Sequence, residues 1–233
     1  METAMAATAK VSAPKAAERP LSVQNAVVMF NDRVKASASQ SCLRWKEGGT
    51  WRTATWSDWD KASREIAGGL IALGVGKGER SCILATTRPE WLYCDIGILM
   101  AGGVTVPIYQ SNLPHECEYI INDSGAKIVF VENPQQLAKV MAERDKMSGV
   151  VKVVYFDASC KLEKPDAQGR TELKLEDVTQ PGDKAWLMSL GELRVEGDKW
   201  LGAHAGELEK RWAEIKADDS FTFVYTSGTT GPP

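Results

Sequence analysis

Residues 221–233 read FTFVYTSGTTGPP and join two short patterns. Residues 221–225 are all aromatic or β-branched, which is typical of a strand. Residues 226–231 gather hydroxyl side chains and two glycines in one tight segment. Glycine lets backbone N–H groups turn toward an anion, and hydroxyls donate further hydrogen bonds. A strand that runs into such a loop predicts a phosphate-binding site, and an ordinary surface loop is the alternative.

The candidate phosphate-binding residues all lie in this loop. They are Thr226, Ser227, Gly228, Thr229, Thr230 and Gly231. The loop differs from the common P-loop, in which a glycine and four further residues are followed by Gly-Lys-Ser/Thr. Here the two glycines are three positions apart, and no lysine follows them in the sequence. The pattern therefore disfavours a P-loop nucleotidase.

The composition is that of a globular protein with reduced cysteines. Of the 233 residues, 43% are hydrophobic and 25% are charged, and the net charge of -3 gives no footprint for nucleic acid. The two histidines, His115 and His204, have no metal-ligand spacing and are expected at or near the surface. The cysteines are scattered without a CxxC pair, so we expect neither a disulfide framework nor a metal site. They are Cys42, Cys82, Cys94, Cys117 and Cys160.

The beginning of the chain has a different composition from the rest. Residues 1–20 are rich in Ala, Lys, Pro and Thr and lack an apolar segment, which predicts a disordered tail rather than a signal peptide. Residues 21–233 are then the domain. The longest apolar stretch, residues 96–109, contains two glycines and a proline and is too short to span a bilayer. We expect a cytoplasmic protein without a transmembrane segment, and a peripheral association with a membrane stays open.

Helix and strand patterns alternate from about residue 50. Ser57 and Asp60 predict a capping box, and Pro89, Pro114 and Pro134 mark further helix starts. The expected helices span residues 57–73, 89–101, 115–122 and 135–146. The expected strands span residues 81–85, 104–109, 127–131 and 150–156. This alternation predicts an α/β fold with a mainly parallel sheet flanked by helices.

The remaining segments carry other patterns. Residues 157–181 are polar and are expected to be irregular. Residues 200–215 place apolar side chains on one face of a single amphipathic helix, which we expect to pack in the core rather than to bind a cofactor. The residues of that face are Trp200, Leu201, His204, Leu208, Trp212 and Ile215. Residues 221–225 are expected to be central in the sheet because of their aromatic and β-branched side chains, with strand partners that lie largely outside these 233 residues, so that an open apolar edge is left.

Residues 225–233 resemble the phosphate-loop signature of the adenylate-forming superfamily, which reads Tyr-Thr-Ser-Gly-Thr-Thr-Gly-x-Pro-Lys-Gly. The match extends to the residue before the family's lysine. Other stretches are similar to the long-chain acyl-CoA synthetases of this superfamily, so the resemblance covers residues 21–233. These stretches are LGVGKGER at residues 73–80, RPEW at 88–91, AGGVTVPIY at 101–109, NDSGAK at 122–127 and LMSLGEL at 187–193.

The resemblance implies a two-step ligase that uses ATP, Mg²⁺ and coenzyme A. A fatty-acid carboxylate would attack the α-phosphate of ATP, giving acyl-adenylate and pyrophosphate. The thiol of coenzyme A would then attack the acyl carbonyl and release AMP. Residues 226–231 would hold the β- and γ-phosphates, where charge builds up, and Mg²⁺ would share that charge.

The resemblance also implies that the chain is part of such an enzyme. The family's adenine and ribose contacts, much of its acyl tunnel and its catalytic lysine follow the phosphate loop. We therefore expect residues 21–233 to be a truncated N-terminal adenylation domain, with no catalytic residue and no activity alone. An acyl-AMP ligase, a carboxylic acid reductase and a peptide-synthetase module stay open within the superfamily. Outside it, the alternative is a non-catalytic binding module.

Overall fold

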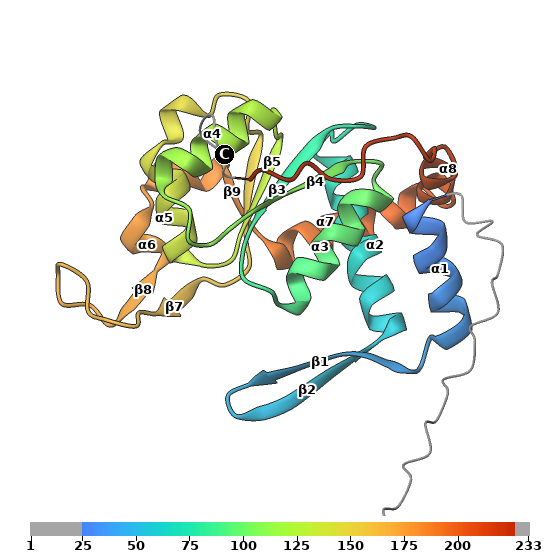
Figure 1. Ribbon diagram of the computed structural model, residues 1–233, viewed down its shortest axis with the longest axis horizontal. Helices are drawn as coiled ribbons and strands as arrows, with labels where there is room; N and C mark the ends of the chain where they lie inside the picture. The colour runs from blue at the N-terminus through green and yellow to red at the C-terminus, as the bar shows by residue number, and fades with distance from the viewer. Residues whose placement is uncertain (1–24, 227–233) are drawn as a thin grey trace, which may run out of the picture.

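The computed structural model describes residues 25–226. Its centre is a five-stranded sheet in the order β4-β3-β5-β6-β9, in which every neighbouring pair is parallel (Figure 1). The strands are β3 (Arg80–Leu84), β4 (Val104–Ile108), β5 (Ile128–Val131), β6 (Lys152–Tyr155) and β9 (Leu187–Ser189). The predicted α/β fold with a parallel sheet is confirmed. The tail predicted for residues 1–20 lies outside the described residues.

Helices build a hydrophobic core against each face of the sheet (Figure 1). Side chains of the strands alternate between the two cores: Ile83 and Phe130 belong to the first, and Leu84 and Val131 to the second. The helices of the first core are α1 (Ala26–Ser37), α2 (Trp56–Ala72), α3 (Pro89–Met100), α7 (Leu190–Ala203) and α8 (Glu207–Ala213). Those of the second are α4 (Pro114–Ser124), α5 (Pro134–Ala142) and α6 (Leu175–Val178).

Local signals fix the ends of several helices. The prolines predicted at helix starts are confirmed as the first residues of α3, α4 and α5. A proline suits this position because its missing N–H group would have no partner within the helix. The carboxamide oxygen of Asn133 caps α5 by accepting from the N–H groups of Gln135 at 3.0 Å and Gln136 at 3.2 Å. α4 ends at Gly125, whose φ of 62° is left-handed.

The capping box predicted at Ser57 and Asp60 is wrong. It lies two residues earlier, where the N–H of Asp58 donates to the hydroxyl of Thr55 at 3.1 Å and the N–H of Thr55 donates to the carboxylate of Asp58 at 2.8 Å. The reason is that a strand, β2 (Thr50–Thr55), runs directly into α2, so the chain turns at Thr55.

Two helices are shorter than predicted. α5 ends at Ala142 and is followed by a 3₁₀ turn, η1 (Arg144–Lys146). The single helix predicted over residues 200–215 is broken into α7 and α8, because Gly206 takes a left-handed φ of 78° between them. The prediction of core packing is confirmed for Leu208 and Trp212, which are buried. His204 is exposed and stacks on Trp200, and His115 is exposed on α4.

Two antiparallel hairpins stand apart from the main sheet. β1 (Ser41–Glu47) pairs with β2 and projects from the body of the chain (Figure 1). β7 (Ser159–Lys161) pairs with β8 (Glu172–Lys174), so residues 157–181, predicted to be irregular, contain this hairpin and α6. A 3₁₀ turn, η2 (Pro181–Ala185), leads into β9. None of the helices within residues 25–226 has the length and apolar character needed to cross a membrane.

Candidate functional site

Residues 221–226 run along the outer edge of β4, where Thr105 fastens them. The N–H of Thr105 donates to the carbonyl of Phe221 at 3.3 Å, and the N–H of Phe223 donates to the carbonyl of Thr105 at 3.1 Å. The hydroxyl of Thr222 donates to the same carbonyl at 2.8 Å. Within the described residues, this segment holds one parallel bridge to β4 and its other side is open, so its predicted central place in the sheet stays a prediction.

The direction of this segment places Thr226, the first residue of the predicted loop. The bridge between Thr105 and Thr222 is parallel, so residues 222–226 proceed toward the carboxyl end of β4. Ligands of open α/β sheets bind at that end of the strands. Thr226, the first candidate phosphate-binding residue, is exposed there. Ser227, Gly228, Thr229, Thr230 and Gly231 lie outside the described residues.

Tyr225 connects the same segment to α4. Its hydroxyl donates to the carboxylate of Asp123 at 2.6 Å, and its ring meets the ring of Tyr119 edge-on, with centroids 6.4 Å apart. Burial raises the pKa of the Tyr225 hydroxyl, and the hydrogen bond to Asp123 raises it further. The hydroxyl therefore stays protonated at neutral pH and remains a donor.

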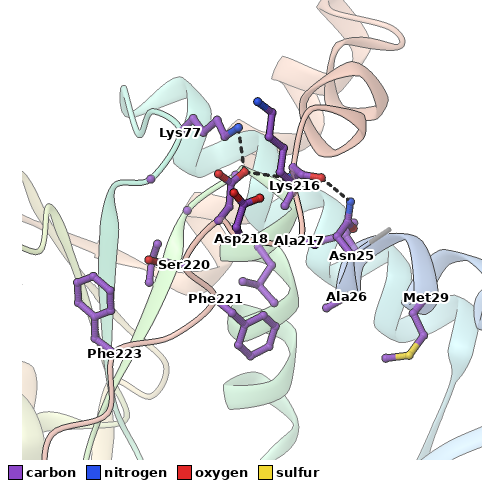
Figure 2. Close-up of a pocket in the computed structure, with 18 residues that line it drawn as sticks. Asn25, Ala26, Met29, Lys77, Lys216, Ala217, Asp218, Ser220, Phe221 and Phe223 are labelled. Carbon is purple, nitrogen blue, oxygen red and sulfur yellow. Dashed lines mark hydrogen bonds and ion pairs between the residues drawn. The ribbon is translucent and has the colours of Figure 1, made fainter. Parts of the chain in front are cut away.

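A cavity of about 710 Å³ lies at the opposite end of β4, beside α1 and the segment that follows α8 (Figure 2). Its walls are largely apolar and include Met29, Leu99 and Phe221. At its rim, the ammonium of Lys77 is 2.9 Å from the carboxylate of Asp219. Thr226, the described member of the predicted phosphate-binding residues, is not among the residues that line this cavity.

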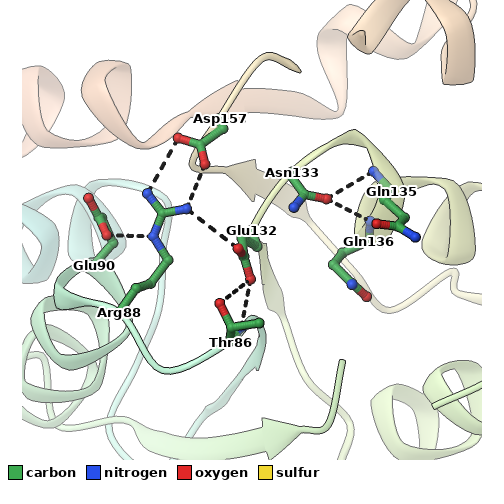
Figure 3. Close-up of polar contacts among 8 residues, drawn as sticks. All are labelled: Thr86, Arg88, Glu90, Glu132, Asn133, Gln135, Gln136 and Asp157. Carbon is green, nitrogen blue, oxygen red and sulfur yellow. Dashed lines mark hydrogen bonds and ion pairs between the residues drawn. The ribbon is translucent and has the colours of Figure 1, made fainter. Parts of the chain in front are cut away.

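A polar group lies at the carboxyl ends of β3 and β5. From β3 the chain continues to β4 on one side of the sheet, and from β5 it continues to β6 on the other side. The carboxyl ends of β3 and β5 therefore border a crevice of the kind in which open α/β sheets commonly bind ligands. Thr86 follows β3 and Glu132 follows β5. The N–H and the hydroxyl of Thr86 both donate to the Glu132 carboxylate, at 2.6 and 2.7 Å (Figure 3). These two residues therefore bridge the gap.

Arg88 completes this group. Its guanidinium donates to Glu90 at 2.6 Å and to Asp157 at 2.5 Å and lies 3.7 Å from Glu132 (Figure 3). Burial lowers the pKa of Arg88, but the hydrogen bonds to Glu90 and Asp157 outweigh it, so the pKa is raised. The guanidinium is therefore fully engaged by carboxylates, and the group joins the ends of neighbouring strands. We call Arg88 and its three carboxylate partners the clasp. This group was not predicted from the sequence.

The part of the chain that the structure describes contains no preformed cluster of three or more metal ligands. Mg²⁺ is usually held by one or two carboxylates together with phosphate oxygens. Asp123, beside the candidate site, already accepts the hydroxyl of Tyr225. Within residues 25–226, no three or more His, Cys, Asp or Glu side chains gather as a metal-binding group. The five cysteines are all free thiols.

The chain is similar to curated ligases over most of its length. A long-chain-fatty-acid–CoA ligase of Rattus norvegicus is 28% identical over 219 residues, which are 93% of this chain and 29% of the relative. A long-chain-fatty-acid–CoA ligase of Mycobacterium bovis is 31% identical over 185 residues, which are 79% of this chain and 26% of the relative. The chain thus spans between a quarter and a third of the length of these relatives.

Solved structures share the fold. An anthranilate CoA ligase in complex with anthranoyl-AMP superposes with a TM-score of 0.61 at 21% identity, over 92% of this chain and 34% of the ligase. A Mycobacterium tuberculosis fatty acyl CoA synthetase gives a TM-score of 0.56 at 21% identity, over 86% of this chain and 32% of the synthetase. A family model described as AMP-binding enzyme matches residues 30–233. The chain therefore belongs to the family of AMP-binding enzymes.

Proposed function

We propose that this chain is the N-terminal part of an ATP-dependent ligase that joins a long-chain fatty acid to coenzyme A. The observation that carries the proposal is the course of residues 221–226, which are hydrogen-bonded to Thr105 and proceed toward the carboxyl end of β4 in a parallel sheet. The names of the Rattus norvegicus and Mycobacterium bovis relatives support the choice of a long-chain fatty acid.

In the first proposed step, a carboxylate oxygen attacks the α-phosphorus of ATP, the acyl–phosphate bond forms and pyrophosphate leaves. In the second, the thiol of coenzyme A attacks the acyl carbonyl, the thioester forms and AMP leaves. Backbone N–H groups and hydroxyls of residues 226–231 would donate to the β- and γ-phosphate oxygens, where negative charge grows. Donors that are already in place lower this barrier, because they need no reorganisation during the reaction.

Mg²⁺ would accompany ATP and neutralise part of the phosphate charge. We propose that phosphate oxygens of ATP supply most of the ligands of this ion, since Mg²⁺ is usually held by one or two carboxylates together with substrate phosphates. The chain's own contribution to the first step would then be the hydrogen-bond donors of the loop.

The experiment is pyrophosphate exchange, measured on the full-length protein that contains this chain. The panel of acids contains fatty acids of increasing chain length, acetate, anthranilate and amino acids. We expect ATP-dependent exchange with fatty acids of about twelve carbons or longer, since long apolar chains gain about 0.8 kcal/mol for each buried methylene group. Exchange with acetate, anthranilate or an amino acid, and none with long-chain fatty acids, would contradict the substrate proposal.

We further propose that the 233 residues alone bind ATP weakly and do not adenylate. Phe221 and Val224 are 47% and 62% exposed, so the segment before the loop presents an open apolar edge. A loop without neighbours to fix it must be ordered on binding, which reduces affinity. Titration of the isolated chain with Mg-ATP by calorimetry tests this. A monodisperse monomer with micromolar affinity would show a self-sufficient nucleotide-binding domain instead.

We propose a cytoplasmic enzyme that meets membranes peripherally, where its fatty-acid substrate partitions. Fractionation of cells that express the full-length protein is the test. We expect the protein in the soluble fraction or released from membranes by high salt, since peripheral electrostatic attraction is screened by salt. Retention after salt and alkaline washes would contradict this location.

A further inference from the structure

The attachment of residues 224–226 depends on one side chain. Within the part of the chain that the structure describes, the last backbone hydrogen bond of this segment runs from Phe223 to Thr105. Beyond it, the hydrogen bond from the Tyr225 hydroxyl to Asp123 fastens the chain. Thr226, the first residue of the proposed phosphate loop, follows directly. The contact therefore stands between the sheet edge and the loop.

The other end of this contact is a rigid support. Asp123 lies in the last turn of α4, which is anchored in the second core by Cys117, Ile120 and Ile121, all buried. The helix then stops at a left-handed glycine, Gly125. An acceptor held on a packed helix keeps its position while the segment that binds to it is placed.

β3 holds the end of the same helix. The guanidinium of Arg80, the first residue of β3, donates to the carbonyls of Ser124 and Gly125. The left-handed φ of 62° favours glycine at position 125, and a Cβ atom there would lie 2.5 Å from the Arg80 guanidinium, which would have to shift. The stretches LGVGKGER and NDSGAK of the sequence thus meet at this point, and together they support Asp123.

The tyrosine is also oriented. Its ring meets the edge of Tyr119 on α4, with ring planes at 89°, which aims the hydroxyl at Asp123 one turn further along the helix. A hydroxyl that donates to a carboxylate forms a short, charge-assisted hydrogen bond, and the 2.6 Å separation fits that class. The direction in which the chain leaves Tyr225 is therefore set by α4.

We propose that Asp123 and Tyr225 form a positioning pair that sets the geometry of the phosphate loop for adenylation, which builds on the proposed function. Neither side chain touches ATP in this account. The pair fixes where the backbone of Thr226 starts, and so where the donors of the following residues meet the phosphates. Displacement of reacting groups by about 1 Å can lower a rate by about 100-fold. A loop without this contact would spend part of its binding energy on being ordered.

The test uses the full-length protein and three variants. Tyr225→Phe keeps the ring and removes the hydroxyl, Asp123→Ala removes the acceptor, and the double variant removes both. Tyr119→Phe is the matched control, because its hydroxyl has no hydrogen bond within the described residues. The readouts are kcat and KM for Mg-ATP in pyrophosphate exchange, the rate of thioester formation from synthetic acyl-adenylate, and the melting temperature.

We expect each single variant to lower kcat/KM for adenylation about tenfold, and the double variant to fall no further, as for residues that act as one unit. Thioester formation and the melting temperature should stay near wild type, and Tyr119→Phe should match wild type throughout. A merely structural pair would lower both half-reactions together, which would overturn the proposal, as would unchanged adenylation in the single variants. Absence of exchange in the wild-type protein would overturn the proposed function and this inference with it.

Discussion

The crossing of α2 with α7 and the outer edge of β4 differ in how closely they are packed. At the crossing, backbone meets backbone: a Cβ atom on Gly68 would lie 2.6 Å from the carbonyl oxygen of Gly197, and one on Gly197 would overlap the carbonyl of Glu65. At the edge, residues 221–226 hold one bridge, and Val224 is 62% exposed. Close fit in the interior determines stability, whereas the loosely held edge can be adjusted to position a ligand.

The largest effect is expected at the crossing. Gly197→Ala should destabilise the 233-residue chain by more than about 3 kcal/mol, because the helices must separate to admit the methyl group. Gly202→Ala in the same helix is the control, since a Cβ there has open space around it. It should be neutral or stabilising by up to about 1 kcal/mol. Urea unfolding measures the stability of both variants. Equal stability would show that the crossing at Gly197 is no more closely packed than the surroundings of Gly202.

An intermediate effect is expected at the clasp of strand ends. Arg88→Ala leaves Glu90, Glu132 and Asp157 facing one another without their cation, and should cost about 2 kcal/mol. The control is Arg52→Ala on the projecting hairpin, where the ion pair with Glu47 has side chains 58% and 65% exposed. That pair should contribute less than about 1 kcal/mol. If both variants lose the same stability, the clasp has no special role.

The cap of α2 should contribute less and should depend on pH. Thr55→Ala removes a capping hydroxyl and should cost about 1 kcal/mol at neutral pH. The backbone N–H and then the hydroxyl of Thr55 lower the pKa of Asp58 below its ordinary value of 3.8. This stabilisation is complete above that value and is lost as the pH falls through the lowered pKa. Thr55→Ala keeps the backbone N–H and loses the share of the hydroxyl, so the difference in stability between wild type and Thr55→Ala should narrow in acid. A constant difference down to pH 2 would contradict the linkage.

The smallest stability change is expected at the edge itself. Val224→Ser should alter the free energy of unfolding of the 233-residue chain by less than about 0.5 kcal/mol, because the side chain is 62% exposed. It should raise the solubility of that chain, since it removes an apolar group from an open edge. Chemical denaturation and light scattering are the measurements. A loss comparable to that of Gly197→Ala would show that the edge is packed like the interior.

Local rules predicted β3, β4, β5 and β6 of the sheet and the proline-marked helix starts, but not β9. Buried parallel strands are apolar runs, and Pro89, Pro114 and Pro134 begin helices for a reason that depends only on the missing N–H. The break at Gly206 was missed because an apolar stripe continues across it in sequence. The hairpin of β1 and β2 is mostly exposed, and its alternation of apolar and polar residues is limited to a short stretch around Leu43 and Trp45, so its strands were missed.

For the candidate site too, local features were predicted from the sequence and long-range contacts were not. Its chemistry was predicted from hydroxyls and glycines that are adjacent in sequence, and Thr226 is placed at the carboxyl end of the sheet as such a loop requires. Its support was beyond sequence reasoning. Asp123 and Tyr225 are 102 positions apart, and the clasp joins Arg88 to Asp157 across 69 positions. Such contacts depend on the order of strands in the sheet, which no local pattern specifies.

The central claim is that residues 226–231 bind the leaving phosphates of ATP, and one comparison tests it most directly. Thr229→Ala and Thr230→Ala are measured in the full-length protein in both half-reactions, with Thr53→Ala on the projecting hairpin as the control. We predict that at least one loop variant slows pyrophosphate exchange by about 100-fold, the loss of about 3 kcal/mol expected for one such donor, while thioester formation from acyl-adenylate stays near wild type. Wild-type exchange rates in both loop variants would contradict the account.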